Sequence, residues 1–370
     1  MKNAEVKLQF VTPCIMSGAE QRKAEFRAPS VRGNLRWWMR ALGCSKELVN
    51  ALFGSANGDH GMRSRVIVRD TTVPEVLKDL EHSEPMNAET LAGSSNDYFL
   101  WPLAKKERGV ISAGTTVSFS IIVRDFGEAP KDVKKKAEFE RAKGTFEKAL
   151  PELKRALKAF LLFGALGTRS RRCYGSIWPT DVVIDGKRDW NIPKTKADFK
   201  NAVADLKLPS ELIVPTIVTH CGVYNAFSND ELAIVECSNF LAKYRRGKYK
   251  PSIYGKNDHD ARWANNNCHC VYRVALGLPL VQTYSDYDPI RRKKHKVESK
   301  IDGYERLASP LHFKVVKLDG GFVPLAIFFP KMVPPNGTMV RLSGGEVRGL
   351  PLNTKIINVI KDDDQLIKIQ

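Results

Sequence analysis

A turn rich in glycine and arginine, Gly164 to Ser176 (GALGTRSRRCYGS), is the segment of this 370-residue sequence best suited to hold a ligand. Glycine lets a backbone turn sharply and approach a ligand closely, and guanidinium groups donate in a fork that matches phosphate. The turn therefore predicts phosphate binding through Arg169, Arg171 and Arg172. It lacks the Gly-Lys-Ser/Thr ending of a P-loop, and it follows a predicted helix, so it is not a dinucleotide fingerprint. The structural alternative is a capping glycine followed by a solvated arginine turn.

A second basic group lies on a predicted helix, Val31 to Leu42, whose apolar residues recur at helical spacing. Arginines recur every four residues along it and form one stripe: Arg32, Arg36 and Arg40. Trp37 lies beside this stripe, and an indole can stack on an unpaired base while guanidinium groups hold the RNA backbone. Trp38 continues the apolar stripe and is expected in the core, whereas the place of Trp37 stays open.

Two basic clusters follow in the second half, Lys243 to Lys250 (KYRRGKYK) and Arg291 to Lys300 (RRKKHKVESK). Such clusters are common in nucleic-acid proteins, and they also occur as ordinary solvated surface. We predict RNA contact for Arg245 and Arg246 of the first cluster.

Metal ligands are sparse in the sequence. Cys268-His269-Cys270 is the densest group, and His220-Cys221 could complete it in space. A structural zinc site usually has ligand pairs two to four residues apart, whereas one residue separates this pair. Buried thiols beside a core histidine are the simpler interpretation. No metal and no cofactor are predicted.

Catalytic groups are also sparse. Metal-free RNA cleavage needs an acid and a base that titrate near neutrality, and no histidine occurs in the predicted arginine helix or in the turn. His60 and His220 are the nearest candidates, without further support. The prediction is therefore a protein that is not an enzyme.

Charge indicates the class of partner. Lys and Arg number 59 against 41 Asp and Glu, which leaves a net charge of +18 and favours a polyanion, nucleic acid above an anionic membrane surface. The alternative is a basic protein that the cytosol simply tolerates. No apolar stretch reaches the length of a membrane span, and the opening MKNAEVKLQFVTP lacks the pattern of a secretory signal. Seven cysteines without a regular framework are typical of reduced thiols. We expect a cytoplasmic protein.

The elements that position these groups form an α+β pattern. The length exceeds that of one hydrophobic core and predicts two domains, residues 1–192 and 210–370, joined by a stretch rich in Pro and Lys, Pro193 to Pro209. The first half has the order strand, helix, strand, strand, helix, strand, which is the ferredoxin-like (RRM-like) order. The second half allows a weaker second copy, with insertions, since Asp258 to Tyr304 fits no part of the pattern. A kink or a fresh helix start is expected at Pro151.

Several segments together resemble a known family. FVTPCIMSGAEQ, EFRAPSVRGNLRWWMRAL, LFGS, FLLFGALGTRSRRCYGS, ALGLPLVQTYSD and ERLASPLHFKV are similar to the first-subunit family of the Cmr module of type III-B CRISPR effector complexes, within the RAMP superfamily. Any one of these segments alone would be weak, but their combination is specific. They touch both halves of the chain, although they make up well under half of it.

The resemblance implies tandem ferredoxin-like domains, RNA binding without catalysis, contact with guide RNA (crRNA) near its 3′ portion, help in target RNA capture, and other Cmr subunits as partners. Carried over by position, it implies RNA contact from Arg32, Gly33, Arg36, Trp37 and Arg40 of the helix, and from Gly167, Arg169, Ser170, Arg171, Arg172 and Gly175 of the turn. Cys173 stands where the family usually has glycine, which puts a positive φ there in doubt. The alternatives are a metal-independent RAMP endoribonuclease that processes guide precursors, and a pure scaffold.

Overall fold

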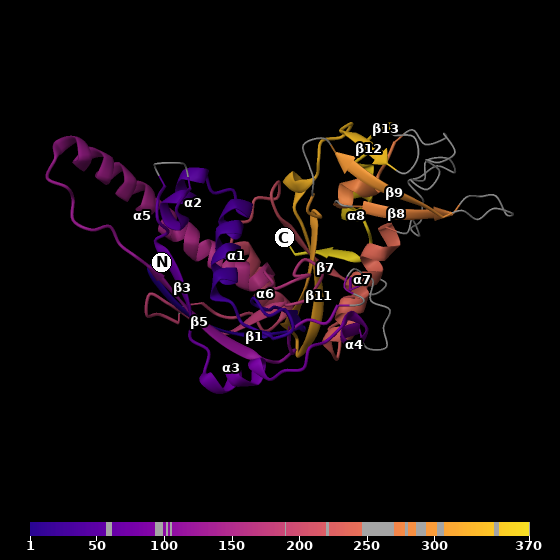
Figure 1. Cartoon of the computed structure of the whole chain (residues 1–370), viewed down its shortest axis with the longest axis horizontal. Helices are drawn as coiled ribbons and strands as arrows, with labels where there is room; N and C mark the ends of the chain where they lie inside the picture. Colours follow the sequence, from indigo (N-terminus) through magenta and orange to yellow (C-terminus); the bar gives the residue numbers. More distant parts are fainter. Residues whose placement is uncertain are drawn as a thin grey trace.

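The computed structural model describes residues 1–56, 61–92, 99–100, 103, 106–188, 190–219, 222–245, 270–277, 280–285, 294–301, 307–343 and 348–369. These residues form a mixed α+β structure with three four-stranded antiparallel sheets and a two-stranded one. The predicted α+β class is therefore confirmed. The two halves of the chain lie side by side along the longest axis of the molecule (Figure 1).

The first sheet carries the elements of the N-terminal half. Its strands are β1 (Asn3–Phe10), β3 (Val66–Asp70), β5 (Thr116–Val123) and β6 (Ile177–Ile184), in the spatial order β3-β5-β1-β6. In β1, buried and more exposed residues alternate, as the period-2 pattern of the sequence predicts. The helices α1 (Ala28–Ala41) and α5 (Val133–Phe163) pack against each other and contact the sheet. The predicted order strand, helix, strand, strand, helix, strand is present.

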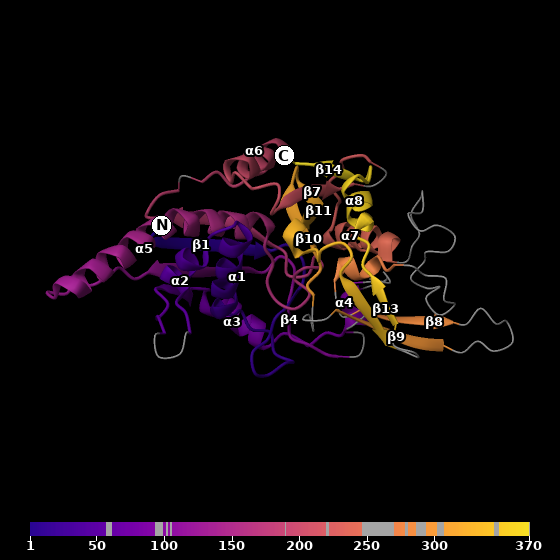
Figure 2. The same cartoon turned by 90° about the horizontal axis from the view of Figure 1, so that it is seen from above.

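Helix α5 is one continuous element of 31 residues that runs through Pro151, so the expected fresh start there is wrong. Its N-terminal part extends away from the rest of the molecule in both views (Figure 2). Shorter elements complete this half: β2 (Cys14–Ile15), β4 (Val110–Ile111), α2 (Lys46–Phe53), α3 (Pro74–Glu81) and α4 (Ala88–Ala92).

The joint between the halves contains a helix, α6 (Lys196–Asp205), where the sequence analysis expected only a connecting stretch. A capping box starts it: the Thr195 side chain accepts from the Asp198 backbone, and the Asp198 side chain accepts from the Thr195 backbone.

The second sheet repeats the strand order of the first. Its strands are β7 (Val214–Val218), β10 (Leu311–Leu318), β11 (Gly321–Phe328) and β14 (Leu366–Lys368), ordered β10-β11-β7-β14. When the strands of each sheet are numbered in chain order, both sheets have the spatial order second, third, first, fourth. Helix α7 (Asp230–Arg245) packs against the second sheet, and helix α8 (Lys355–Lys361) belongs to the same half.

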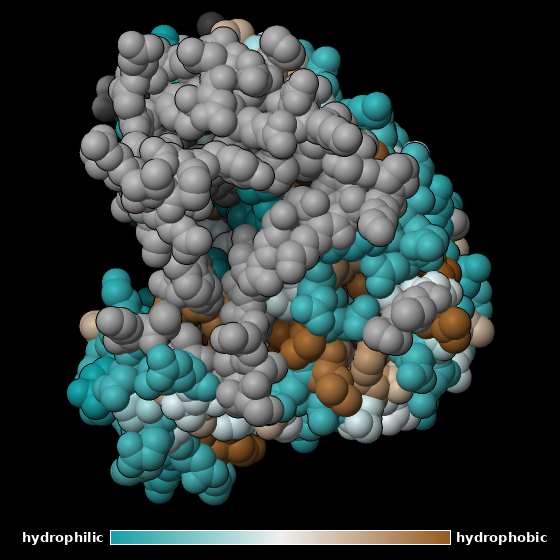
Figure 3. Space-filling model, turned by 90° about the vertical axis from the view of Figure 1, so that its right-hand side faces the viewer, coloured by the Kyte–Doolittle hydropathy of each residue, from teal (hydrophilic) through white to brown (hydrophobic). Residues whose placement is uncertain are grey.

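A third sheet lies at the end of the C-terminal half. It has the order β13-β12-β9-β8 and consists of β8 (Leu280–Ser285), β9 (Lys294–Ile301), β12 (Met339–Ser343) and β13 (Arg348–Pro351). The strands β8 and β9 fall within the stretch that fitted no predicted pattern. On this end of the molecule, hydrophilic residues make up most of the described surface, and hydrophobic ones form small groups between them (Figure 3). None of the helices in the described ranges has the length and apolar character to cross a bilayer.

Candidate nucleic-acid interface

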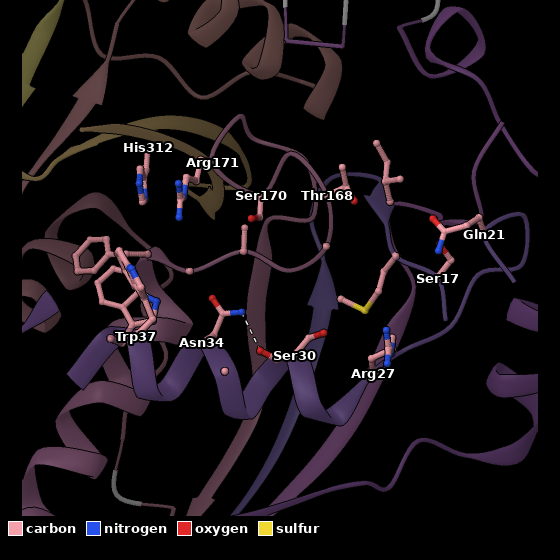
Figure 4. Close-up of a pocket in the computed structure, with 18 residues that line it drawn as sticks. Ser17, Gln21, Arg27, Ser30, Asn34, Trp37, Thr168, Ser170, Arg171 and His312 are labelled. Atoms are coloured by element: carbon pink, nitrogen blue, oxygen red, sulfur yellow. Dashed lines mark hydrogen bonds between the residues drawn. The ribbon is translucent and has the colours of Figure 1, made fainter. Parts of the chain in front are cut away.

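A cavity of about 570 Å³ lies between α1, the segment around β2 and the glycine and arginine turn. Figure 4 shows Thr168, Ser170 and Arg171 on the turn, facing Ser30 and Asn34 on α1. The C-terminal half contributes His312 to the wall. The described residues that line the cavity are Ile15, Met16, Ser17, Gln21, Arg27, Ser30, Gly33, Asn34, Trp37, Trp38, Phe163, Gly164, Ala165, Gly167, Thr168, Ser170, Arg171 and His312.

Backbone hydrogen bonds fix the shape of the turn. The Thr168 amide donates to the Ile15 carbonyl at 2.7 Å, and the Gly175 amide donates to the Pro13 carbonyl at 2.8 Å. Gly167 and Gly175 have φ angles of +80° and +68°, in the left-handed region that side chains disfavour. A Cβ at Gly167 would also lie 2.5 Å from the Ile15 carbonyl oxygen. These two glycines therefore let the turn fold tightly against β2.

The turn also holds a cysteine in the left-handed region. Cys173 has a φ of +68° and is fully buried. The positive φ that the sequence put in doubt is thus present without a glycine. A positive φ costs a residue other than glycine on the order of 1 kcal/mol. Burial of the thiol, which fills space in the core, offsets this cost.

The same turn joins the two halves by adding to the edge of β10. The Cys173 amide donates to the Phe313 carbonyl at 3.0 Å, and the Phe313 amide donates to the Arg171 carbonyl at 3.1 Å. The Val315 amide donates to the Ser176 hydroxyl at 3.0 Å. This pairing brings His312, one residue from Phe313, to the cavity.

Trp37 lies half-buried on the cavity wall. Its ring packs edge-on to Trp38 and to Phe329 and stacks on His312. Trp38 is buried in the core, as its place on the apolar stripe predicted. The indole of Trp37 is therefore held by aromatic packing while part of its surface remains available.

The three arginines of the turn have different environments. The side chain of Arg171 is exposed, lines the cavity, and has no hydrogen-bond or ion-pair partner among the described residues. The Nε of Arg169 donates to the Phe99 carbonyl at 2.7 Å, and an Nη of Arg172 donates to the Leu311 carbonyl at 2.8 Å. The Arg172 guanidinium also lies near the Phe99 and Phe313 rings. Arg171 alone of the three thus faces the cavity.

The arginine stripe of α1 does not share the cavity. Residues three and four apart share a helix face, and the cavity face of α1 consists of Ser30, Gly33, Asn34 and Trp37. Arg32 and Arg40 are exposed and Arg36 is half-buried on a neighbouring face. The structure therefore brings together Trp37, Gly167, Ser170 and Arg171 of the predicted site, but not Arg32, Arg36, Arg40, Arg169, Arg172 or Gly175.

Sequence reasoning missed several lining residues. Arg27 precedes the first turn of α1, and its ion pair with Glu25 is long, at 3.6 Å, between exposed groups. Asn34 donates through its amide nitrogen to the Ser30 carbonyl at 2.9 Å, which leaves its oxygen for a ligand. The position of Arg27 beside the predicted helix start was a usable signal, whereas nothing local in the sequence indicated His312.

The electrostatics of the cavity favour an anion. Arg27 and Arg171 line it, and the described lining residues include no carboxylate. Burial, followed by the positive charges of Arg171 and Arg172, holds the pKa of His312 well below its usual value of 6.5. The imidazole is therefore neutral in the free protein near neutral pH.

The remaining predicted residues lie elsewhere. Arg245 donates to the Leu276 carbonyl at 2.8 Å, away from the cavity. His60, His220, Arg246 and Cys268 lie outside the described residues. Cys270 is half-buried, and within the described ranges no group of three or more His, Cys, Asp or Glu side chains is placed to hold a metal ion.

The part of the chain that forms most of this cavity matches the model of a known family. Residues 7–178, a little under half of the chain, match the model of the RAMP superfamily. The match includes α1 and the glycine and arginine turn, whereas His312 lies beyond it. The resemblance inferred from the sequence is thereby confirmed.

Individual relatives come from CRISPR systems. The CRISPR system Cmr subunit Cmr1-2 of Pyrococcus furiosus is 38% identical over 78 residues, which is 19% of this chain and 40% of that relative's length. The crystal structure of apo Cmr1 from Pyrococcus furiosus is similar with a TM-score of 0.55 and 17% identity, over 100% of this chain and 99% of that one. A chain of the type III-B Cmr-beta complex bound to cognate target RNA is similar with a TM-score of 0.53 and 13% identity, over 97% of this chain and 98% of that one. The two structural likenesses show a shared fold.

Proposed function

We propose that this protein is a non-catalytic, cytoplasmic RNA-binding subunit of a type III-B CRISPR (Cmr) effector complex. It contacts guide RNA near its 3′ portion, helps to capture target RNA and works with other Cmr subunits. The observation that carries the proposal is the cavity that brings Trp37 and Arg171 together without a carboxylate among its described lining residues. The match of residues 7–178 to the RAMP superfamily and the fold shared with Cmr1 support it.

The cavity suits one or two unpaired nucleotides. Single-stranded RNA is bound by stacking of its bases on aromatic or guanidinium planes and by cations along its backbone. Trp37 offers the stacking surface, and Arg171 offers a guanidinium with no partner among the described residues. Hydroxyl groups of Ser30, Thr168 and Ser170 add donors and acceptors for sugar and base edges.

Gly33 adds support from an unexpected direction. Glycine in a helix interior costs about 1 kcal/mol relative to alanine, and a Cβ at Gly33 would meet no atom of the described residues within 4 Å. Packing within the chain therefore gives no reason for glycine at this position. Because Gly33 lies on the cavity wall, close approach of a ligand to the helix backbone supplies one.

We assign different tasks to the other predicted residues. Arg169 and Arg172 position the turn, and Arg171 and Ser170 contact RNA directly. The stripe Arg32, Arg36 and Arg40 continues the RNA path outside the cavity, and Arg245 and Arg246 belong to a further basic contact. The equal strand order of the first two sheets supports two tandem ferredoxin-like domains, residues 1–192 and 210–370, with the third sheet as an insertion.

The test is the salt dependence of binding to a single-stranded, repeat-derived RNA. Arg171→Ala should weaken binding for all sequences and lower the log-log salt slope by about 0.7, since one phosphate contact is lost. Arg188→Ala is the matched control, because Arg188 is an exposed arginine paired with Asp181 away from the cavity. An unchanged slope in Arg171→Ala would contradict the assignment. Site-specific cleavage of the RNA in a chelator would instead support the endoribonuclease alternative.

A further inference from the structure

His312 brings a second nitrogen to the cavity from the C-terminal half. It lies in β10, lines the cavity, and is placed beside Arg171 (Figure 4). Its Nε2 is buried and has no hydrogen-bond partner among the residues that the structure describes. A buried polar atom without a partner costs about 1–3 kcal/mol, so such an atom on a cavity wall calls for a ligand.

The protonation state of the ring follows from its contacts. The Ser309 backbone raises the pKa of His312, but burial and the charges of Arg171 and Arg172 outweigh it and keep the ring neutral. In a neutral imidazole with a proton on Nδ1, Nε2 carries a lone pair. In this tautomer, Nε2 is a covered acceptor at the cavity wall that can take a proton.

The surroundings of His312 decide when Nε2 becomes a donor. Among the groups packed around it, the turn supplies the charges of Arg171 and Arg172, α1 supplies the Trp37 ring, and the C-terminal half supplies Phe329. Two guanidinium groups oppose a further positive charge. An anion bound at Arg171 would offset this repulsion and favour the imidazolium.

We propose that His312 and Arg171 together hold one phosphate of the bound RNA, and that one solvent proton enters at Nε2 as the phosphate arrives. The imidazolium then donates from Nε2 to a phosphate oxygen. Because Nε2 is covered in the free protein, the side chains over it must move when the phosphate binds. This inference rests on the proposed RNA-binding function and adds a residue that lies outside the RAMP match.

The experiment measures the affinity of the full chain for a single-stranded RNA between about pH 5.5 and 8, the range in which histidine titrates. The wild-type Kd should fall as pH falls, by at most about tenfold per pH unit for one proton. His312→Gln should flatten this dependence, so that its Kd changes less between pH 8 and pH 5.5 than the Kd of the wild type. His82→Gln is the control, since His82 is exposed on the C-cap of α3.

A second measurement keeps the test sharp if His312→Gln folds poorly. Titration calorimetry of the wild-type protein, in two buffers with different ionisation heats, gives the number of protons taken up per RNA bound. His312→Asn, which has no titratable side chain, should take up none. RNA binding without proton uptake, or uptake that persists in His312→Asn, overturns this inference and leaves the proposed function standing. The absence of RNA binding at every pH overturns the proposed function itself.

Discussion

The indole of Trp37 stacks on the imidazole of His312, with ring centroids 5.5 Å apart and ring planes inclined by 25°. Trp37 belongs to α1 of the N-terminal half and His312 to β10 of the C-terminal half. Phe329 packs against both rings. The wall of the cavity therefore exists only when the two halves are docked.

Removal of the indole should weaken RNA binding. Trp37→Ala is expected to cost about 1–3 kcal/mol of binding free energy, the range for one base stacked on an aromatic ring, whereas Trp37→Phe should keep most of the affinity. Fluorescence anisotropy with a labelled single strand gives the Kd values. Trp190→Ala serves as the control, because this half-buried tryptophan lines a different cavity. Equal losses in Trp37→Ala and Trp190→Ala would contradict a stacking role for Trp37.

Arg172 should contribute more than Arg171 to the free energy of unfolding. Arg172→Ala removes the hydrogen bond to Leu311 and the contacts with two aromatic rings, and we expect a loss of about 2 kcal/mol in the free energy of unfolding. Arg171→Ala should change that free energy by less than about 0.5 kcal/mol, as for an ordinary surface substitution. Urea denaturation of both variants checks the contrast. Equal free energies of unfolding for Arg172→Ala and Arg171→Ala would show that the contacts of Arg172 do not stabilise the two halves.

Gly175 of the turn and Gly33 of the cavity wall should respond oppositely to alanine. Gly175→Ala puts a Cβ onto the Leu166 carbonyl oxygen at a φ of +68°, so we expect a loss of at least about 2 kcal/mol of stability or failure to fold. Gly33→Ala meets no atom and should stabilise the protein by up to about 1 kcal/mol. It should nevertheless weaken RNA binding. Denaturation and binding measurements on Gly33→Ala separate the two effects, and unchanged affinity would remove the proposed close approach there.

A buried lysine should make stability depend on pH. Lys314 is 1% exposed, its Nζ donates to the Leu161 carbonyl at 2.9 Å, and burial holds its pKa well below the usual 10.5. Between the folded pKa and 10.5, the unfolded chain binds more protons than the folded one, so stability rises with pH in this window.

Lys314→Met tests this dependence, because it removes the amine and keeps most of the apolar side chain. Between about pH 7 and 10, the free energy of unfolding of this variant should change less with pH than that of the wild type. At neutral pH, the variant should be at least as stable as the wild type. Identical pH profiles for Lys314→Met and the wild type would mean that Lys314 stays charged in the folded protein.

Much of the fold could be predicted because its signals are local. The alternation around Val6 and Leu8 and the turn at Asp319 and Gly320 correspond to β1 and to the β10–β11 hairpin. Helix α6 was missed although Thr195 and Asp198 have capping-box spacing, because proline and lysine dominate the composition around them. The buried Lys314 could not be foreseen, since the carbonyl that accepts from it is 153 residues away.

The site was predictable only in part. The chemistry of Trp37 and Arg171 could be inferred from residue types, and both lie on the cavity. Spacing alone could not show that α1 turns Arg32, Arg36 and Arg40 to another face, or that Arg169 and Arg172 bind backbone carbonyls of distant segments. His312 enters through a strand pairing between the halves, which no local pattern encodes.

The pairing of the turn with β10 has a further consequence for self-association. β10 is an outer strand of its sheet, and exposed outer strands invite pairing with strands of other molecules. The backbone from Arg171 to Cys173 occupies the donor and the acceptor of Phe313. The segment that carries Arg171 thus also shields this margin of the sheet from aggregation.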